Sequence, residues 1–100
     1  MNDYILLMHN DSTPSATGSE DEAWGSYLAK LKASGRFQGG SAVGTGVCVN
    51  RAGTPVALSS HIVGFLRVSA ESLEQARELV LGNPVFEAGG TVEIRELPRT

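Results

Sequence analysis

The chain has 100 residues, of which 41% are hydrophobic and 19% charged, a composition typical of one globular domain. We therefore predict a single domain over residues 1–100. A formal net charge of −3 gives no electrostatic reason to bind a phosphate backbone, so nucleic acid is not an expected partner. No basic segment followed by an apolar one opens the chain, and no run approaches the roughly 18 apolar residues that span a bilayer. Association with a membrane is therefore not expected.

The motifs that usually announce a cofactor or a covalent mechanism are absent. Cys48 is the only cysteine, which rules out an intramolecular disulfide and fits a reducing, cytoplasmic environment. The glycines match neither GxGxxG nor GxxxxGK[ST], so a phosphate-binding loop is not indicated. GxSxG and HExxH are missing as well. We therefore expect neither a bound cofactor nor a metal.

The first sixty residues alternate strand and helix signals. An apolar run over residues 4–8 is too short for a helix and predicts a strand, followed by a small, polar loop over residues 12–19. Ser19 and Glu22 have the spacing of a capping box, which begins a helix predicted over residues 19–34. Its apolar stripe consists of Trp24, Tyr27, Leu28 and Leu31.

A second strand and a hairpin are predicted next. Residues 36–43 form an apolar and glycine-containing strand. Apolar and polar side chains alternate over residues 47–50, residues 50–53 have the composition of a turn, and residues 55–58 return as a second strand. This order predicts an inserted β-hairpin. Pro55 places the returning arm of this hairpin at an edge.

The last forty residues give the clearest sequence of elements. Residues 61–68 form a strand with apolar side chains on both faces, and Ser72 with Gln75 makes a second capping box for a helix over residues 72–81. An Asn83-Pro84 break follows, and residues 91–97 alternate as a half-buried strand.

This order predicts an α+β domain of the ferredoxin-like βαββαβ kind, with two helices on one face of an antiparallel sheet. The other face retains Val63 and Phe65, an apolar surface that a soluble monomer seldom leaves open. We therefore predict a homodimer that buries sheet against sheet. The alternative is that the hairpin and the loop over residues 12–19 fold across that face.

Several short runs together resemble the YCII-related family, including its branch known for a DGPF motif. These runs are residues 64–68, 72–76, 83–90 and 91–97, and residues 4–8 and 28–40 agree in character. The resemblance implies a dimeric α+β barrel of the ferredoxin-like kind. The DGPF motif itself is absent, and residues 58–61 stand in its place.

The resemblance also bears on the site. Many members carry a histidine on the first helix, before a Leu-Ala-Arg-Leu-like segment, which has been regarded as a candidate active-site partner of an acidic residue after the first strand. Here Tyr27 precedes the equivalent Leu-Ala-Lys-Leu segment, so that histidine is missing. The acidic partner maps either to Asp11 or, one position earlier, to the uncharged Asn10.

Acid/base chemistry near neutral pH points to the two histidines, since histidine ionises in that range. We expect Asp11 and His61 to form a catalytic acid/base pair at one edge of the sheet. His9, Tyr27 and Ser60 are the expected ligand-binding residues, with the Tyr27 phenol as a hydrogen-bond donor. The alternatives are purely structural positions without a functional role: an exposed loop for His9, the core or an interface for His61, and the core for Tyr27. A metal held jointly by His9, Asp11 and His61 has no supporting motif spacing.

Two functions follow from these residues. The first is a small-molecule enzyme whose pocket lies between the sheet and the first helix, open toward the loop over residues 12–19. The second is a non-catalytic dimeric module that binds a small ligand or supports another protein. In that case the tyrosine at position 27 reflects a relaxed need for catalysis.

Overall fold

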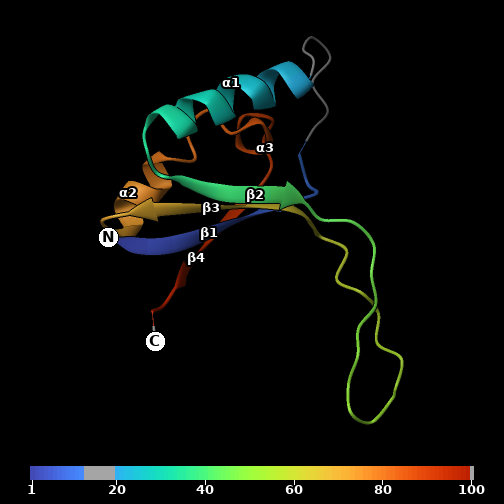
Figure 1. Cartoon of the computed structure of the whole chain (residues 1–100). Helices are drawn as coiled ribbons and strands as arrows, with labels where there is room; N and C mark the ends of the chain where they lie inside the picture. Colours follow the sequence, from blue (N-terminus) through green and yellow to red (C-terminus); the bar gives the residue numbers. More distant parts are fainter. Residues whose placement is uncertain (13–19, 100) are drawn as a thin grey trace.

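The computed structural model describes residues 1–12 and 20–99 and has a small α+β fold (Figure 1). The strands are β1 (Asn2–His9), β2 (Phe37–Ala42), β3 (Ile62–Ala70) and β4 (Val92–Leu97), and the helices are α1 (Glu20–Ala33), α2 (Leu73–Glu78) and α3 (Pro84–Glu87). The four strands and two longer helices match the sequence predictions, with ends that differ by a few residues. Most of the predicted loop over residues 12–19, including the cap at Ser19, lies outside the described residues.

The strands form one antiparallel sheet in the order β2-β3-β1-β4. β1 lies inside the sheet because its apolar run suits burial: Leu6 pairs with Leu66 of β3 on one side and with Ile94 of β4 on the other. Burial alternates along β1, so that Tyr4, Leu6 and Met8 face the core. The register of this strand therefore decides which residues of its neighbours are buried.

All three helices lie on one side of the sheet (Figure 1). None of the described helices is long and apolar enough to cross a membrane. The core lies between these helices and the sheet, and the apolar stripe predicted for α1 contributes to it through the buried Tyr27 and Leu31 and the half-buried Trp24 and Leu28. The other buried core residues are Tyr4, Leu6, Met8, Leu66, Val68, Ala70, Ala76 and Val80.

Local hydrogen bonds fix the two short helices. The Ser72 hydroxyl accepts from the Gln75 backbone N–H at 3.2 Å, whereas the Gln75 side chain accepts from the Glu71 N–H at 2.7 Å. The predicted cap is present, and its return bond reaches Glu71. At the predicted Asn83-Pro84 break, Asn83 Oδ1 accepts from the N–H groups of Val85 and Phe86, at 2.9 and 3.3 Å. Asn83 therefore begins α3, a short helix beyond the two predicted from the sequence.

The hairpin prediction was wrong about the two strands but correct about the turn. Residues 43–60 contain no strand, although the Gly53 N–H donates to Asn50 O at 3.1 Å. The segment extends away from the sheet (Figure 1), and all of its residues are exposed, so its apolar side chains are not packed within the described part of the chain. A two-stranded hairpin without such packing is marginally stable, and Pro55 lacks a backbone donor.

The sheet face opposite the helices is only partly covered. Ile5, Leu7 and Phe65 are half-buried there, and Val63 is 41% exposed. Residues 43–60 extend away from the body and do not fold across this face (Figure 1). The other segment expected to cover it, residues 13–19, lies outside the described residues.

Replacing Asn83 with alanine removes both hydrogen bonds that begin α3. We expect Asn83→Ala to lower the free energy of unfolding by about 1 to 2 kcal/mol, the usual cost of losing an N-cap. Asn83→Ser keeps an oxygen acceptor and should lose less than half as much. Urea denaturation of the three proteins measures the difference, and equal losses for alanine and serine would contradict the capping role.

Candidate functional site

A cavity of about 440 Å³ lies between the sheet and α1. Its lining is mainly apolar, with polar groups at one end where β1 leaves the sheet. Gly40 keeps this side of the sheet flat, since a methyl group there would lie 2.7 Å from Leu66 Cδ2. The lining residues are Met8, His9, Asn10, Ser12, Trp24, Leu28, Phe37, Gly40, Ser41, Ala42, Val63, Gly64, Phe65, Leu66 and Val85.

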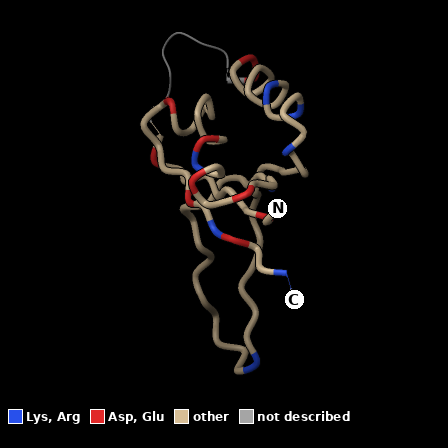
Figure 2. Tube along the Cα trace, turned by 90° about the vertical axis from the view of Figure 1, so that its left-hand side faces the viewer, with Lys and Arg blue, Asp and Glu red and all other residues tan. Residues whose placement is uncertain are grey.

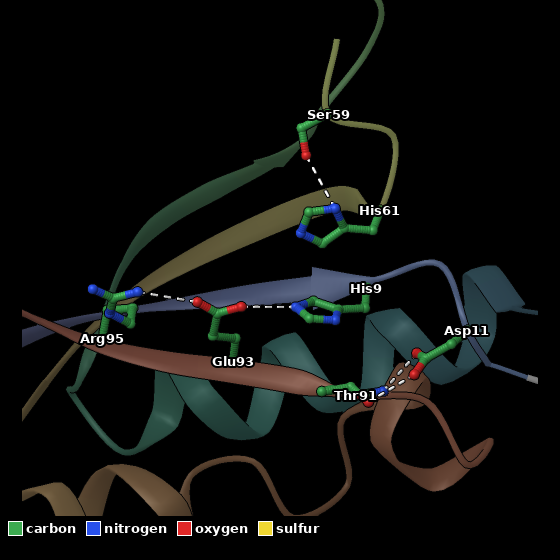
Figure 3. A network of polar contacts seen from close by, with 7 residues as sticks. All are labelled: His9, Asp11, Ser59, His61, Thr91, Glu93 and Arg95. Atoms are coloured by element: carbon green, nitrogen blue, oxygen red, sulfur yellow. Dashed lines mark hydrogen bonds and ion pairs between the residues drawn. The ribbon is translucent and has the colours of Figure 1, made fainter. Parts of the chain in front are cut away.

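His9 is held by a carboxylate from the last strand. Its Nε2 lies 2.9 Å from Glu93 Oε1, and Glu93 Oε2 accepts from Arg95 at 3.3 Å (Figure 3). The bond to His9 and the guanidinium of Arg95 lower the pKa of the Glu93 carboxyl group. Glu93 therefore stays ionised at neutral pH, and an ionised carboxylate can fix the orientation and tautomer of the imidazole.

His61 lies beside His9. The two ring centroids are 5.2 Å apart in an edge-to-face arrangement, and His61 Nδ1 lies 3.1 Å from the Ser59 hydroxyl (Figure 3). Glu93 pairs with Leu7 on β1, whose side chain lies on the face away from the helices. The two histidines, Ser59 and Glu93 thus form a polar cluster at one end of the sheet, which we call the histidine cluster. His9 belongs both to this cluster and to the cavity lining.

Asp11 makes a different set of contacts. Its Oδ1 accepts from the Thr91 backbone N–H at 2.8 Å, and its Oδ2 accepts from the Thr91 hydroxyl at 2.7 Å (Figure 3). These two bonds lower the pKa of the Asp11 carboxyl group, with the hydroxyl as the larger cause. Among the hydrogen bonds of the described residues, none joins Asp11 to His61. Asp11 secures the start of β4 to the end of β1.

The remaining expected ligand-binding residues lie apart from the cavity. Tyr27 is 4% exposed and its hydroxyl donates to Leu79 O at 2.6 Å, so its proton is already used within the fold. Burial raises the pKa of this phenol. The backbone carbonyl of Ser60 accepts from Asn10 Nδ2 at 3.0 Å, which ties two chain segments together. Of the residues expected at the site, His9 alone is among the cavity lining.

Some residues of this region were not anticipated from the sequence. Apolar and polar side chains alternate along β4, a pattern that predicts a solvent-facing carboxylate for Glu93. Only the pairing of β4 with β1 brings Glu93 to His9. Trp24 was expected in the core, and it also lines the cavity. Within residues 1–12 and 20–99, no group of three or more His, Cys, Asp or Glu side chains is arranged to hold a metal ion.

The sequence of residues 3–99 matches the model for the YCII-related domain. No curated protein matches the chain. One solved structure with a similar fold is 5-chloro-2-hydroxyhydroquinone dehydrochlorinase from Burkholderia phenoliruptrix AC1100, in complex with 2,5-dihydroxybenzoquinone. That alignment has a TM-score of 0.59 and 17% sequence identity, and covers 98% of this chain and 95% of the other. At this identity the likeness extends to the fold.

The Asp11 contacts predict a specific dependence of stability on pH. The pKa of Asp11 in the folded protein lies below its ordinary value of 3.8. The two bonds from Thr91 therefore contribute stability above that ordinary value, and the contribution is lost as pH falls through the lowered pKa. Thr91→Val removes the hydroxyl donor, so the free energy of unfolding of this variant should fall less between about pH 6 and pH 2.5 than that of the wild type. The difference should develop as pH falls below the ordinary Asp11 pKa of 3.8 and through its lowered value.

Thr91→Ser provides the matched control because it keeps the hydroxyl that bonds to Asp11 Oδ2. We expect the serine variant to follow the wild-type profile when urea midpoints are measured across this pH range. If serine and valine give the same profile, the hydroxyl of Thr91 is not what lowers the pKa of Asp11.

Proposed function

The chain belongs to the YCII-related family, and we propose that it binds a small, ring-shaped, largely apolar molecule in the cavity between α1 and the sheet. The cavity carries this proposal: about 440 Å³ lies within the range of roughly 300 to 1,000 Å³ that is usual for ligand pockets. Trp24 and Phe37 offer aromatic contacts, and Asn10 and Ser12 supply polar groups at one end. The bound dihydroxybenzoquinone of the bacterial dehydrochlorinase, a planar ring with oxygen substituents, supports the same class of ligand.

The chemistry we propose for this ligand is proton transfer by His9 at the polar end of the cavity. The imidazole lies with Glu93 on the sheet face away from α1, so a ligand meets it only where it extends past this end of the lining. Among the described residues that line the cavity, His9 is the only histidine, the residue type that most often serves as a general acid or base. Glu93 orients the imidazole, as the carboxylate partner of such a histidine does. We therefore favour a His9 and Glu93 pair over the Asp11 and His61 pair expected from the sequence. That the similar dehydrochlorinase is an enzyme supports a catalytic function.

The second candidate function is ligand binding without catalysis, and Tyr27 favours it. This residue occupies the position at which many family members carry the histidine of the suspected active-site pair. Its hydroxyl is committed to Leu79 O and its side chain is buried outside the cavity lining. Position 27 thus makes a structural contact here and supplies no acid or base to a ligand.

We further propose that two copies pack sheet against sheet as a ferredoxin-like dimeric α+β barrel in the cytoplasm. The strand order β2-β3-β1-β4 with its antiparallel pairs is the order of ferredoxin-like folds and supports this arrangement. The partly covered apolar face with Ile5, Leu7, Val63 and Phe65 supports the dimer. The single Cys48 supports the reducing location.

Ligand binding can be followed through Trp24, the only tryptophan of the chain and a residue of the cavity lining. We expect hydroquinone, catechol or salicylate to change its fluorescence in a saturable way. Ala42→Phe places a large side chain in the lining and should weaken binding at least about tenfold, because the ring occupies ligand volume. Titration calorimetry with the same compounds measures the affinity independently of optical effects.

Ala29→Phe is the matched control because Ala29 is exposed on α1 and lies outside the cavity lining. It adds the same ring to the protein and should leave the affinity unchanged. Binding that survives Ala42→Phe, or that both variants weaken equally, would place the ligand elsewhere.

Catalysis and simple binding are separated by turnover of a bound compound, followed by mass spectrometry. If His9 transfers protons, His9→Asn should slow turnover by about 10² to 10⁴ with little change in affinity, and Glu93→Gln should slow it less. Asp11→Asn and His61→Ala test the pair expected from the sequence. Tight binding without turnover in the wild type would establish the non-catalytic function, and full activity of His9→Asn would exclude His9 as the acid or base.

A further inference from the structure

The segment over residues 44–60 projects from the sheet between β2 and β3, and we call it the arm (Figure 1). We propose that the arm packs against a second copy of this chain, so that each protomer of a two-fold dimer embraces the other. The inference rests on the dimer proposed above and adds a surface to it, because sheet-on-sheet packing by itself gives the arm no role.

Every residue of the arm is exposed in the single chain. Val47 is 82% and Val49 88% exposed, and Val56 and Leu58 are also largely open to solvent. The only charged residue in the arm is Arg51, and Figure 2 shows the blue of lysine and arginine at the tip of the arm and no red along it. The four large apolar side chains of the arm, Val47, Val49, Val56 and Leu58, are therefore exposed together, as is typical of an interaction surface.

The arm has its own internal hydrogen bonds although all of its residues are exposed. Asn50 Nδ2 donates to Thr54 O at 2.9 Å, and the Thr54 N–H donates to Asn50 Oδ1 at 3.2 Å. Cys48 Sγ lies 3.6 Å from Ala57 O, which links the two sides of the arm. At the base, Asn10 bonds to the carbonyl groups of Ser60 and His61. A surface fixed in this way loses little conformational entropy when a partner binds.

The exposed area of the chain is larger than that of a compact monomer. A folded monomer of 10.5 kDa exposes about 5,400 Å², whereas this chain exposes 6778 Å², roughly 1,400 Å² more. The radius of gyration is 15.1 Å, against about 13 Å for a compact domain of this length. A standard protein interface buries about 800 Å² on each partner. The surplus area is therefore sufficient for a stable dimer contact.

A second copy fits this surface better than another kind of partner. The arm extends beyond the sheet on the side opposite the helices (Figure 1), where Val63 and its neighbours leave an apolar face uncovered. One chain thus carries two apolar surfaces on the same side. In a two-fold dimer each arm can contact the other protomer, because both protomers contribute the same surfaces. The single charge of the arm offers no basis for recognising nucleic acid or an acidic membrane.

The test is a double substitution, Val47→Glu with Val49→Glu, at positions where the single chain makes little contact. Thr45→Glu with Thr54→Glu is the matched control, because it adds the same two charges to exposed polar positions of the same arm. Sedimentation equilibrium of the full chain gives the mass and the dissociation constant, and circular dichroism verifies that the fold is kept. We expect the wild type at twice 10.5 kDa at micromolar concentration. The valine variant should raise the dissociation constant about a hundredfold, and the control less than about tenfold.

A third variant, Val63→Glu, separates the arm from the sheet face. If Val63→Glu dissociates the dimer and the valine variant does not, the arm contact is overturned and the sheet-on-sheet dimer stands. A wild type that remains monomeric overturns both. Equal dissociation by the valine variant and the threonine control would also overturn the proposal, because charge and not apolar contact would then govern assembly.

Discussion

The pairing of β1 with β3 in the middle of the sheet is the constraint on which the rest of this structure depends. Leu6 of β1 and Val68 of β3 are completely buried, and the register between the strands sets the side on which every neighbouring residue lies. A slip of one residue would turn the core side chains of β1 to solvent and bring Ile5 and Leu7 beneath the helices. The same slip would bring Asp3 and His9 beneath the helices, where burying polar side chains without partners costs free energy. The register is therefore fixed by packing on both sides of β1.

The same pairing explains why the polar residues gather at one end of the sheet. A register shift between Met8 and His9 ends the regular ladder, so the chain leaves β1 where the cavity opens. His9 turns to Glu93 on one neighbour of β1 and approaches His61 at the start of the other. The next residue, Asn10, donates a hydrogen bond to the Ser60 carbonyl group at the base of the arm. One strand end thus connects the proposed ligand cavity, the histidine cluster and the proposed dimer contact.

These contacts join the proposed dimer surface to the proposed ligand cavity. The arm is anchored through Asn10, which lines the cavity, and Val63 contributes both to the cavity and to the uncovered sheet face. A partner that packs on the arm or covers that face would contact residues that are joined to the ligand cavity. By linkage, a ligand that favours the arrangement of the proposed dimer would strengthen that dimer to the same degree.

The sequence by itself determined the elements whose causes are local. The apolar run of β1, the stripe of α1, the cap at Ser72 and the turn at Asn50 are all set by neighbours within a few residues, and each is found in the structure. Local signals failed where tertiary packing was needed, as in the arm, whose alternating valines form no strand without a surface to pack on.

The tertiary structure alone decided the site. Glu93 reaches His9 across 84 residues of sequence and Thr91 reaches Asp11 across 80, so neither contact has a local signature. Tyr27 could equally have faced a ligand, and only the placement of Leu79 gave its hydroxyl an acceptor in the core. The sequence determines which polar and ionisable side chains are present. The register of β1 with its neighbours determines which of them come into contact, because hydrogen bonds act only over a few ångströms.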